Sequence, residues 1–381
     1  MKNIINENIQ WIDKVWNNLD DKLRVVARRS FDKLPYTSVN GVHDNKHDTE
    51  PDWWTNGFWG GMMWLMYAET GNEVYKMTAM RSEELIGDAL KDFKKLHHDV
   101  GFMWHILSGA NYRLTGNTRS CNLNLYMAAM LFSRFNVDGD YIRAWNVCPE
   151  LAGWTIIDCM MNIPLLYWAS EEIGDDRFKK IAMRHADMAM RDHIRSDGSV
   201  NHIVEHNPET GEVIKVHSGQ GYSETSCWTR GSAWAIYGFV LSYIHTGKID
   251  YLNTARKAAD YFISNCANFD FMTPIDFCAP PEPLYYDSTA GVCAACGMIE
   301  IAGCLSEEDG LKYMEAAIKI LKATDSRFCN YGKDEDSIVQ MGSERYPVNG
   351  DMSGVHIPII YGDFFFAEAI LKLKGSKFLI W

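Results

Sequence analysis

Apolar residues recur at helical spacing through most of the chain, and short polar turns separate the apolar runs. Turns with a helical run on both sides occur around Gly71, Gly116, Gly174, Gly247 and Gly310. Glycine readily takes the left-handed conformation that ends a helix, and an Asn or Asp after it suits the start of the next helix. The pattern therefore predicts a series of helical hairpins.

The hairpins recur as a degenerate repeat of two helices, and a sixth hairpin is needed to use the C-terminal helix in YGDFFFAEAILKLKG. Six hairpins can close into a barrel, whereas an open solenoid requires polar repeats at both ends. The last segment is strongly apolar, and no linker rich in Pro, Gly or Ser interrupts the chain. We therefore predict an all-α protein, an (α/α)6 barrel that forms a single domain over residues 1–381.

Two short segments depart from the helical pattern. GSVNHIVEH and GEVIKVHS alternate apolar and polar residues, as strands do when one face is buried. They follow each other closely, so we expect a β-hairpin inserted between helices.

Composition excludes several functions. The formal net charge is −13 and no basic run is present, which argues against nucleic acid or an anionic membrane as a partner. The sequence has no apolar stretch of ~18 residues, the length of a membrane span, and MKNIINENIQ lacks the pattern of a signal peptide. We expect a cytoplasmic location. The 10 cysteines, including the CAAC at 293–296, are expected to be reduced and mostly buried.

Two aspartates are candidates for catalysis. Asp158 lies within the apolar run WTIIDCMMNIPLLYW, so it either caps the following helix or has a raised pKa that lets it carry a proton near neutrality. Asp99 precedes the apolar segment GFMWHIL and could be a helix cap or a second catalytic carboxylate. Paired carboxylates are common in sugar chemistry, and the 13 Trp either fill the core or stack on sugar rings.

Other polar residues suggest a binding site. His97, His98 and His105 raise the question of a metal, but no HExxH or comparable ligand spacing is present, so we predict no metal and no cofactor. Arg230 lies between Trp228 and Trp234 and could form a positive pocket for a carboxylate ligand. The alternative is an Arg that caps a neighbouring helix.

Taken together, DWWTNGFWGG, HHDVGF, IIDCMMNIPLLYWA, CWTRGSAWAIYGF and YGDFFFAEAILKL resemble the unsaturated glucuronyl hydrolases of glycoside hydrolase family 88. The resemblance extends from about Asp52 to Leu373. It implies an (α/α)6 barrel that hydrolyses oligosaccharides ending in a 4,5-unsaturated uronic acid. It makes Asp158 the general acid/base and Asp99 the second essential aspartate. It places at substrate-contacting positions Trp54, Trp145, His202, Gln220, Arg230, Trp234 and, more loosely, Tyr346.

The resemblance has one clear departure, because Gly219 stands where the family often has a histidine. This puts the sugar contacts on that side of the site in doubt. The segment QMGSERYPVNGDMSGVHIP, residues 340–358, is expected to shape the side that receives the remaining sugar. Two other functions stay open. One is an unsaturated rhamnogalacturonyl hydrolase acting on pectin fragments, and the other is a sugar-binding helical protein without catalysis.

Overall fold

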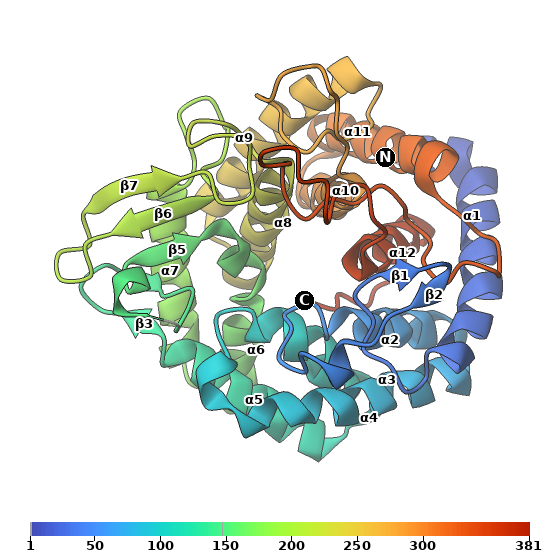
Figure 1. The fold of residues 1–381 in the computed structure, drawn as a ribbon, viewed down its shortest axis with the longest axis horizontal. Helices are drawn as coiled ribbons and strands as arrows, with labels where there is room; N and C mark the ends of the chain where they lie inside the picture. The colour runs from blue at the N-terminus through green and yellow to red at the C-terminus, as the bar shows by residue number, and fades with distance from the viewer. Residues whose placement is uncertain (1, 147) are drawn as a thin grey trace.

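The helices form two concentric rings in the computed structural model, which describes residues 2–146 and 148–381 (Figure 1). The inner ring consists of α2 (Phe58–Thr70), η4 (Gly101–Gly109) continued by α4 (Ala110–Thr115), α6 (Pro164–Ile173), α8 (Thr229–Thr246), α10 (Ser288–Cys304) and α12 (Ile360–Lys374). The outer ring consists of α1 (Lys2–Arg29), α3 (Glu73–Ile86), α5 (Thr118–Phe132), α7 (Arg177–Asp192), α9 (Ile249–Cys266) and α11 (Glu307–Phe328).

The inner ring is closed. Each inner helix contacts the next one along the chain, and the last helix, α12, packs against the first, α2. Five outer helices follow their inner partners directly, whereas α12 pairs with α1 from the other end of the chain. The predicted (α/α)6 barrel is confirmed, with the sixth pair formed by the first and last helices.

The two rings differ in their pattern of burial. The inner helices α8, α10 and α12 are buried on almost every side, because each lies between neighbours in both rings. The outer helices bury one face and expose the other, as α7 does with its alternating charged and apolar residues.

Most of the predicted turns form as expected. Left-handed glycines end inner helices at Gly71, Gly116, Gly174 and Gly247. Asn72 and Asn117 then cap the following outer helices, since their side chains accept hydrogen bonds from backbone N–H groups in the first turn.

The fifth predicted turn was placed wrongly. Gly310 lies inside α11, and the turn comes earlier, where Ser306 caps the helix by accepting a hydrogen bond from the backbone of Asp309. The preceding helix, α10, is followed by Leu305 in an extended conformation, so no left-handed glycine is needed there.

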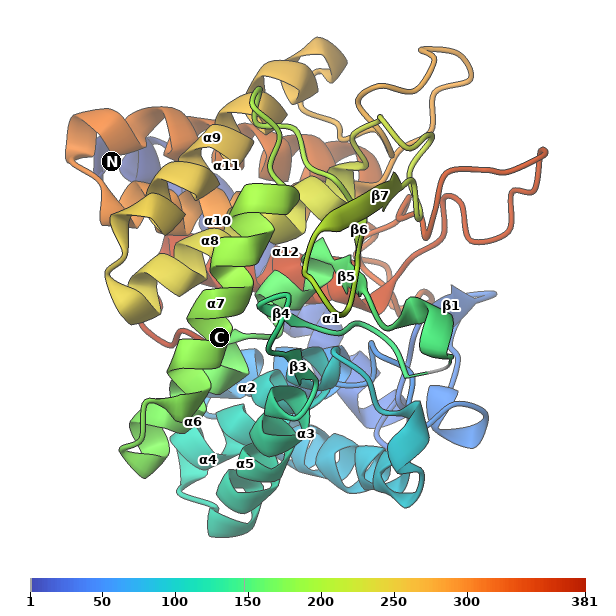
Figure 2. The same cartoon turned by 90° about the vertical axis from the view of Figure 1, so that its left-hand side faces the viewer.

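Short strands and long loops gather at one end of the barrel (Figure 2). The predicted hairpin is present as β6 (Ile203–His206) and β7 (Val213–His217), which pair antiparallel. The sequence did not reveal β5 (Trp154–Ile156), which adds to the edge of β6. Two smaller hairpins are β1 (Ser38–Val39) with β2 (Val42–His43), and β3 (Phe135–Asn136) with β4 (Tyr141–Ile142). Short 3-10 turns are η1 (Lys46–Asp48), η2 (Gly87–Lys91), η3 (Phe93–Lys95), η5 (Pro149–Leu151), η6 (Ile157–Met161) and η7 (Ala267–Phe269).

The C-terminal segment fills the interior of the barrel. Trp381 is buried, its ring stacks on Phe365, and its indole N–H donates to Glu368. Arg113 donates to the backbone carbonyls of Leu379 and Ile380, which holds the segment in place. None of the described helices combines the length and the hydrophobicity that a membrane span requires.

The cysteines are unpaired within the described chain. Cys293 and Cys296, the pair from the CAAC segment, are both buried inside α10, whereas Cys278 is exposed.

Candidate active site

A cavity of about 1260 Å³ opens at the end of the barrel that carries the strands. Segments at or before the start of α2, η4, α6 and α8 line it, so four inner helices direct their N-terminal ends toward it. Helix N-termini carry partial positive charge, which favours an anionic ligand in a chain whose net charge is −13. Both predicted catalytic aspartates and five of the seven predicted substrate contacts lie in the lining: Trp54, Trp145, His202, Gln220 and Arg230.

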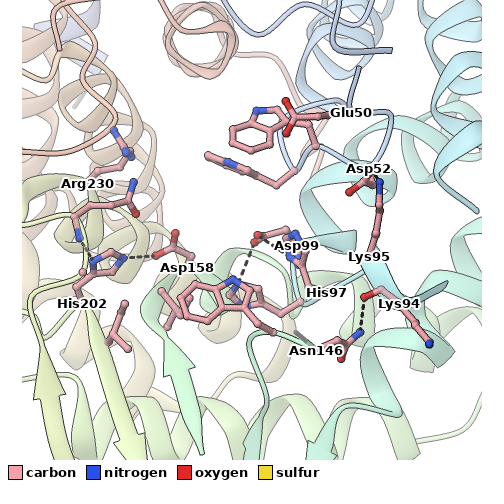
Figure 3. Close-up of a pocket in the computed structure, with 18 of the residues that line it drawn as sticks. Glu50, Asp52, Lys94, Lys95, His97, Asp99, Asn146, Asp158, His202 and Arg230 are labelled. Atoms are coloured by element: carbon pink, nitrogen blue, oxygen red, sulfur yellow. Dashed lines mark hydrogen bonds and ion pairs between the residues drawn. The ribbon is translucent and has the colours of Figure 1, made fainter. Parts of the chain in front are cut away.

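Asp158 faces this cavity from η6, the turn that precedes α6 (Figure 3). Its side chain is 17% exposed, and its Oδ1 atom has no hydrogen-bond partner among the described residues. Burial, and after it the charge of Asp99, raise the pKa of Asp158 to about 7, while the charge of Arg230 acts to lower it. The helix-cap alternative is wrong, because α6 begins at Pro164 and no side chain caps it.

The neighbours of Asp99 change its pKa in the opposite direction. Its Oδ1 atom accepts a hydrogen bond from the Asn162 side chain at 3.0 Å, and the nearest nitrogens of His97 and His98 lie 3.2 and 3.5 Å from its oxygens. Burial acts to raise the pKa of Asp99, but these neighbours outweigh burial and the pKa falls below its usual value. The helix that follows has Val100 at its cap position and no side-chain cap, so Asp99 does not serve as a cap.

The two aspartates therefore differ in protonation near neutral pH. Asp99 is ionised, whereas a large fraction of Asp158 retains its proton. A pair of carboxyl groups whose environments separate their pKa values in this way can divide the roles of acid and electrostatic partner.

Asn162 connects the two carboxylate loops and was not predicted. Its amide group donates to Asp99 and to the backbone carbonyl of Asp158, while its Oδ1 accepts from the backbone of Phe102. Gly101 makes this approach possible, because a β-carbon there would lie 2.6 Å from the Asn162 Cα atom. The only sign in the sequence is a polar residue within the apolar run MMNIPLL.

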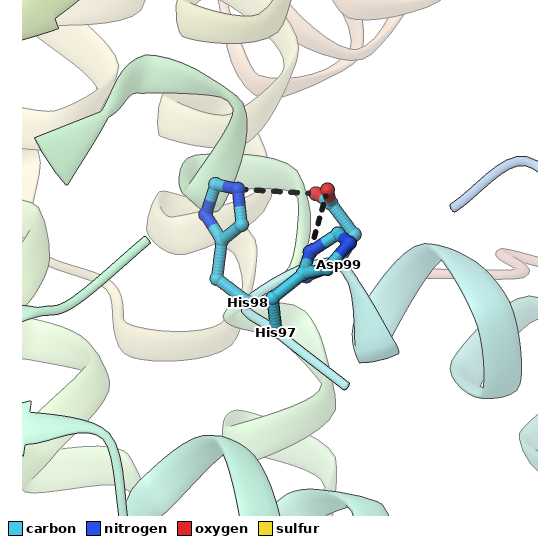
Figure 4. A group of neighbouring side chains, drawn as sticks. All are labelled: His97, His98 and Asp99. Carbon is cyan, nitrogen blue, oxygen red and sulfur yellow. Dashed lines mark hydrogen bonds and ion pairs between the residues drawn. The ribbon is translucent and has the colours of Figure 1, made fainter. Parts of the chain in front are cut away.

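His97, His98 and Asp99 form a compact group whose ligand atoms lie within 4.8 Å of one another (Figure 4). These are residue types that could hold a cation. One Asp99 oxygen, however, already accepts the Asn162 amide hydrogen, and that N–H group would oppose a cation at the same oxygen. His105 lies elsewhere, buried in the barrel wall beside Asn124.

Arg230 is a buried residue of the cavity wall and is bound to several protein groups. It forms an ion pair with Asp287 at 2.8 Å and donates to the backbone carbonyls of Ser343 and Glu344. Its guanidinium also lies 4.4 Å from the Trp228 ring. Asp287 caps α10, so Arg230 supports the cap of a neighbouring helix and still lines the cavity.

The 343–344 segment also holds Gln220. The Gln220 side chain donates to the Glu344 carbonyl at 2.6 Å, and the backbone N–H of Tyr346 donates to the Gln220 carbonyl at 2.8 Å. Tyr36 anchors the segment from the far side, since its hydroxyl donates to the Glu344 carboxylate. Glu344 was not predicted, because its role depends on contacts between distant parts of the chain.

Two predicted substrate contacts lie outside the cavity lining. Trp234 is fully buried and packs against Phe102 and Phe365 beneath the site. Tyr346 packs its ring against Tyr222 and Tyr285 beside the site. Residues of the lining that the sequence did not single out include Glu50, Lys94, Lys95 and Asn146.

Comparison with known proteins identifies the family. The model of Glycosyl Hydrolase Family 88 matches residues 26–268. The chain belongs to glycosyl hydrolase family 88. Among its family 88 relatives, the unsaturated glucuronyl hydrolase of Bacillus sp. (strain GL1) is 35% identical, with 95% of this chain and 97% of that protein covered.

Two further relatives extend the comparison. The unsaturated chondroitin disaccharide hydrolase of Streptococcus pneumoniae (strain ATCC BAA-255 / R6) is 30% identical, with 98% of this chain and 93% of that protein covered. A solved family 88 structure that holds dGlcA-Glc-Rha-Glc has a TM-score of 0.86 at 32% identity, with 94% of this chain and 97% of that chain covered. These relatives match the family expected from the sequence motifs.

Proposed function

We propose that this chain hydrolyses oligosaccharides whose non-reducing end is a 4,5-unsaturated uronic acid, such as those that polysaccharide lyases release from glycosaminoglycans. One observation carries the proposal: Asp158, whose pKa is raised to about 7, and Asp99, whose pKa is lowered, face the same cavity. The family relatives support the substrate class, because their names and one bound ligand refer to unsaturated glucuronyl or chondroitin oligosaccharides.

The chemistry begins at the double bond. The C4=C5 bond is conjugated with the ring oxygen as a vinyl ether, so a proton added at C4 leaves positive charge shared between C5 and that oxygen. Asp158 donates this proton, since it faces the cavity and its pKa of about 7 leaves about half of the molecules protonated at neutral pH. Asp99 remains negative and stabilises the developing positive charge, while also binding sugar hydroxyls.

Water then completes the reaction. A water molecule adds to C5 and gives its proton to the Asp158 carboxylate, which restores the acid. The resulting hemiketal opens to a ketone at C5, and the hemiacetal left at C1 releases the remaining sugar as an alcohol. The net change is hydrolysis without direct attack on the anomeric carbon.

The other residues bind the sugars. Trp54 and Trp145 offer aromatic faces to the rings, and the inner-helix N-termini together with Arg230 favour the uronate carboxylate. A sugar-binding protein without catalysis has no need for a buried, unpartnered acid at the cavity wall. A cavity of about 1260 Å³ is larger than the 300–1,000 Å³ of a typical ligand site, so it has room for two or more sugar units.

The test is a panel of unsaturated disaccharides from chondroitin, hyaluronan, heparin, gellan and pectin. We expect loss of the alkene's ultraviolet absorbance together with release of one equivalent of the second sugar. Turnover of the pectin fragment alone would instead favour the rhamnogalacturonyl hydrolase. Release of sugar with the absorbance retained would contradict the hydration mechanism.

A further inference from the structure

Gly219 occupies an unusual place in the cavity lining, on the loop between β7 and α8. Its φ is +56°, in the left-handed region that favours glycine. A β-carbon at this position would lie 2.2 Å from His202 Nδ1 and 2.7 Å from its Cε1. A side chain at 219 therefore cannot coexist with the present position of His202.

His202 is in turn fixed beside Asp158. Its carbonyl accepts a hydrogen bond from the backbone of Ile157 at 3.1 Å, so β6 is tied to the residue before the catalytic acid. Its ring lies 4.2 Å from the Trp228 ring, and its Nε2 atom lies 3.7 Å from Asp158 Oδ1. Figure 3 shows His202 directed at Asp158 across one side of the cavity.

The tautomer of His202 follows from its neighbours. The backbone N–H of Gln220 lies 3.1 Å from Nδ1 and can only donate, so Nδ1 accepts this hydrogen bond. The Ser218 carbonyl, 3.4 Å from the same nitrogen, would require the opposite tautomer, and its contact is the longer of the two. Burial lowers the pKa of His202 to about 3, so the ring is neutral and its hydrogen is on Nε2, facing Asp158.

We propose that Gly219 and His202 act together as positioning residues for the catalytic acid. The inference rests on the proposed function. The Nε2–H group faces Asp158 Oδ1 and therefore stabilises the form of the acid in which Oδ1 is the carbonyl oxygen. The acidic hydrogen is then on Oδ2, directed to the substrate. At 3.7 Å this contact exceeds a hydrogen bond, and we expect it to shorten when substrate fills the cavity. Gly219 contributes by leaving space for the imidazole.

A double-mutant cycle tests this arrangement. Gly219→Ala, His202→Ala and the double variant are compared with the wild type by kcat and KM on an unsaturated disaccharide. We expect Gly219→Ala to lower kcat about ten-fold or more in the wild-type background but less than about three-fold when His202 is already alanine. An equal loss in both backgrounds would show that Gly219 acts through the loop backbone and would overturn the proposal.

Gly71→Ala is the matched control. Gly71 also has a left-handed φ, +64°, but a β-carbon there meets no atom within 4 Å. The variant therefore carries the same kind of backbone strain without the contact to His202. We expect its kcat to equal that of the wild type, and a similar loss in both glycine variants would assign the effect to backbone strain.

A measurement without substrate separates this inference from the proposed function. Nitrogen-15 NMR of the histidine side chains, assigned by the signals lost in His202→Ala, reports the tautomer directly. We expect Nε2–H in the wild type and a changed His202 signal in Gly219→Ala. An Nδ1–H tautomer in the wild type, or an unchanged signal in Gly219→Ala, would overturn the proposal. Failure of every disaccharide to react would contradict the proposed function alone.

Discussion

Asp158 is half-buried and Asp363 is buried, and the two carboxyl groups have similar acidity in different surroundings. Burial is the largest cause that raises the pKa of each to about 7. Asp363, in the first turn of α12, accepts hydrogen bonds from the backbone N–H groups of Ile338 and Val339. Asp158 has an oxygen without a partner among the described residues and faces the cavity.

The comparison shows that a raised pKa alone does not identify a catalytic acid. Asp363 has backbone N–H partners, is 1% exposed, and ties the segment at 338–339 to the barrel, so its role is structural. Asp158 lacks such partners and reaches the cavity, so its proton can pass to a ligand. Access and hydrogen bonding, rather than acidity, separate the two functions.

The largest expected effect comes from exchanging the Asp158 carboxyl group for an amide. Asp158→Asn should lower kcat by ~10² to 10⁴ with little change in KM, because an amide of the same shape cannot donate the proton. Steady-state kinetics on an unsaturated disaccharide measure this. A variant that kept more than about a tenth of the wild-type kcat would remove Asp158 from the role of acid.

Asp363→Asn is the matched control for that substitution. It should keep kcat within about three-fold of the wild type, since Asp363 is not among the residues that line the active-site cavity. It should lower the free energy of unfolding by about 1–3 kcal/mol, because an amide can present its NH₂ group to backbone donors. The reverse result, a large kcat loss for Asp363 and none for Asp158, would invert the comparison.

Arg230 tests the hydrogen-bonding part of the comparison, because it is a buried group of the cavity wall with several protein partners. Arg230→Lys keeps the charge but loses the planar fork that donates to Asp287, Ser343 and Glu344. We expect kcat/KM to fall about ten- to a hundred-fold, at ~1.4 kcal/mol per decade, and the melting temperature to fall as well. Full kcat/KM with a lowered melting temperature would leave Arg230 a purely structural residue.

Stability as a function of pH gives a smaller effect. The folded-state pKa of Asp158, about 7, lies above its ordinary value of 3.8, so the folded protein binds more protons than the unfolded chain between these limits. The contribution of Asp158 to the free energy of unfolding is therefore at its maximum below pH ~4 and is lost as the pH rises through about 7. The melting temperature of Asp158→Asn minus that of the wild type should increase by about 2–5 °C from pH 5 to pH 8. A difference in melting temperature that did not change with pH would mean that folding does not raise the pKa of Asp158.

Chelation is expected to have the smallest effect. A cation at the His97, His98 and Asp99 group would neutralise Asp99 and remove its contribution to the raised pKa of Asp158. We expect full activity after exhaustive dialysis against a chelator, measured against an untreated sample. If activity were lost and then restored by added divalent metal, the group of His97, His98 and Asp99 would be a metal site. The account of why the pKa of Asp158 is raised would then be weakened.

The features that the sequence predicted are mainly local ones. Inner helices, the glycine turns at Gly71 and Gly116, and the β6–β7 hairpin follow from spacing and turn chemistry. The sequence identified Asp158 because burying a charged residue within an apolar run is costly and therefore indicates a structural or catalytic role. The turn near Gly310 was misplaced because a serine cap gives a weaker signal than glycine.

The features that the sequence did not reveal depend on contacts between distant segments. Asn162 binds Asp99 across 63 positions of the chain, and the Glu344 carbonyl binds Arg230 at a separation of 114. The fit of Gly219 against His202 likewise appears only in three dimensions. Trp234 was expected to touch substrate from its place in a motif, whereas the barrel buries it beneath the cavity.

The most direct test of the central claim is the pH dependence of kcat/KM for an unsaturated disaccharide, which reports the protonation of the free enzyme. The active form requires a protonated Asp158, so we predict that kcat/KM falls above an apparent pKa of about 7. It should also fall at acid pH, as Asp99 is protonated below its usual range. A profile that stayed level from pH 6 to about pH 9, with no fall near 7, would contradict Asp158 as the proton donor.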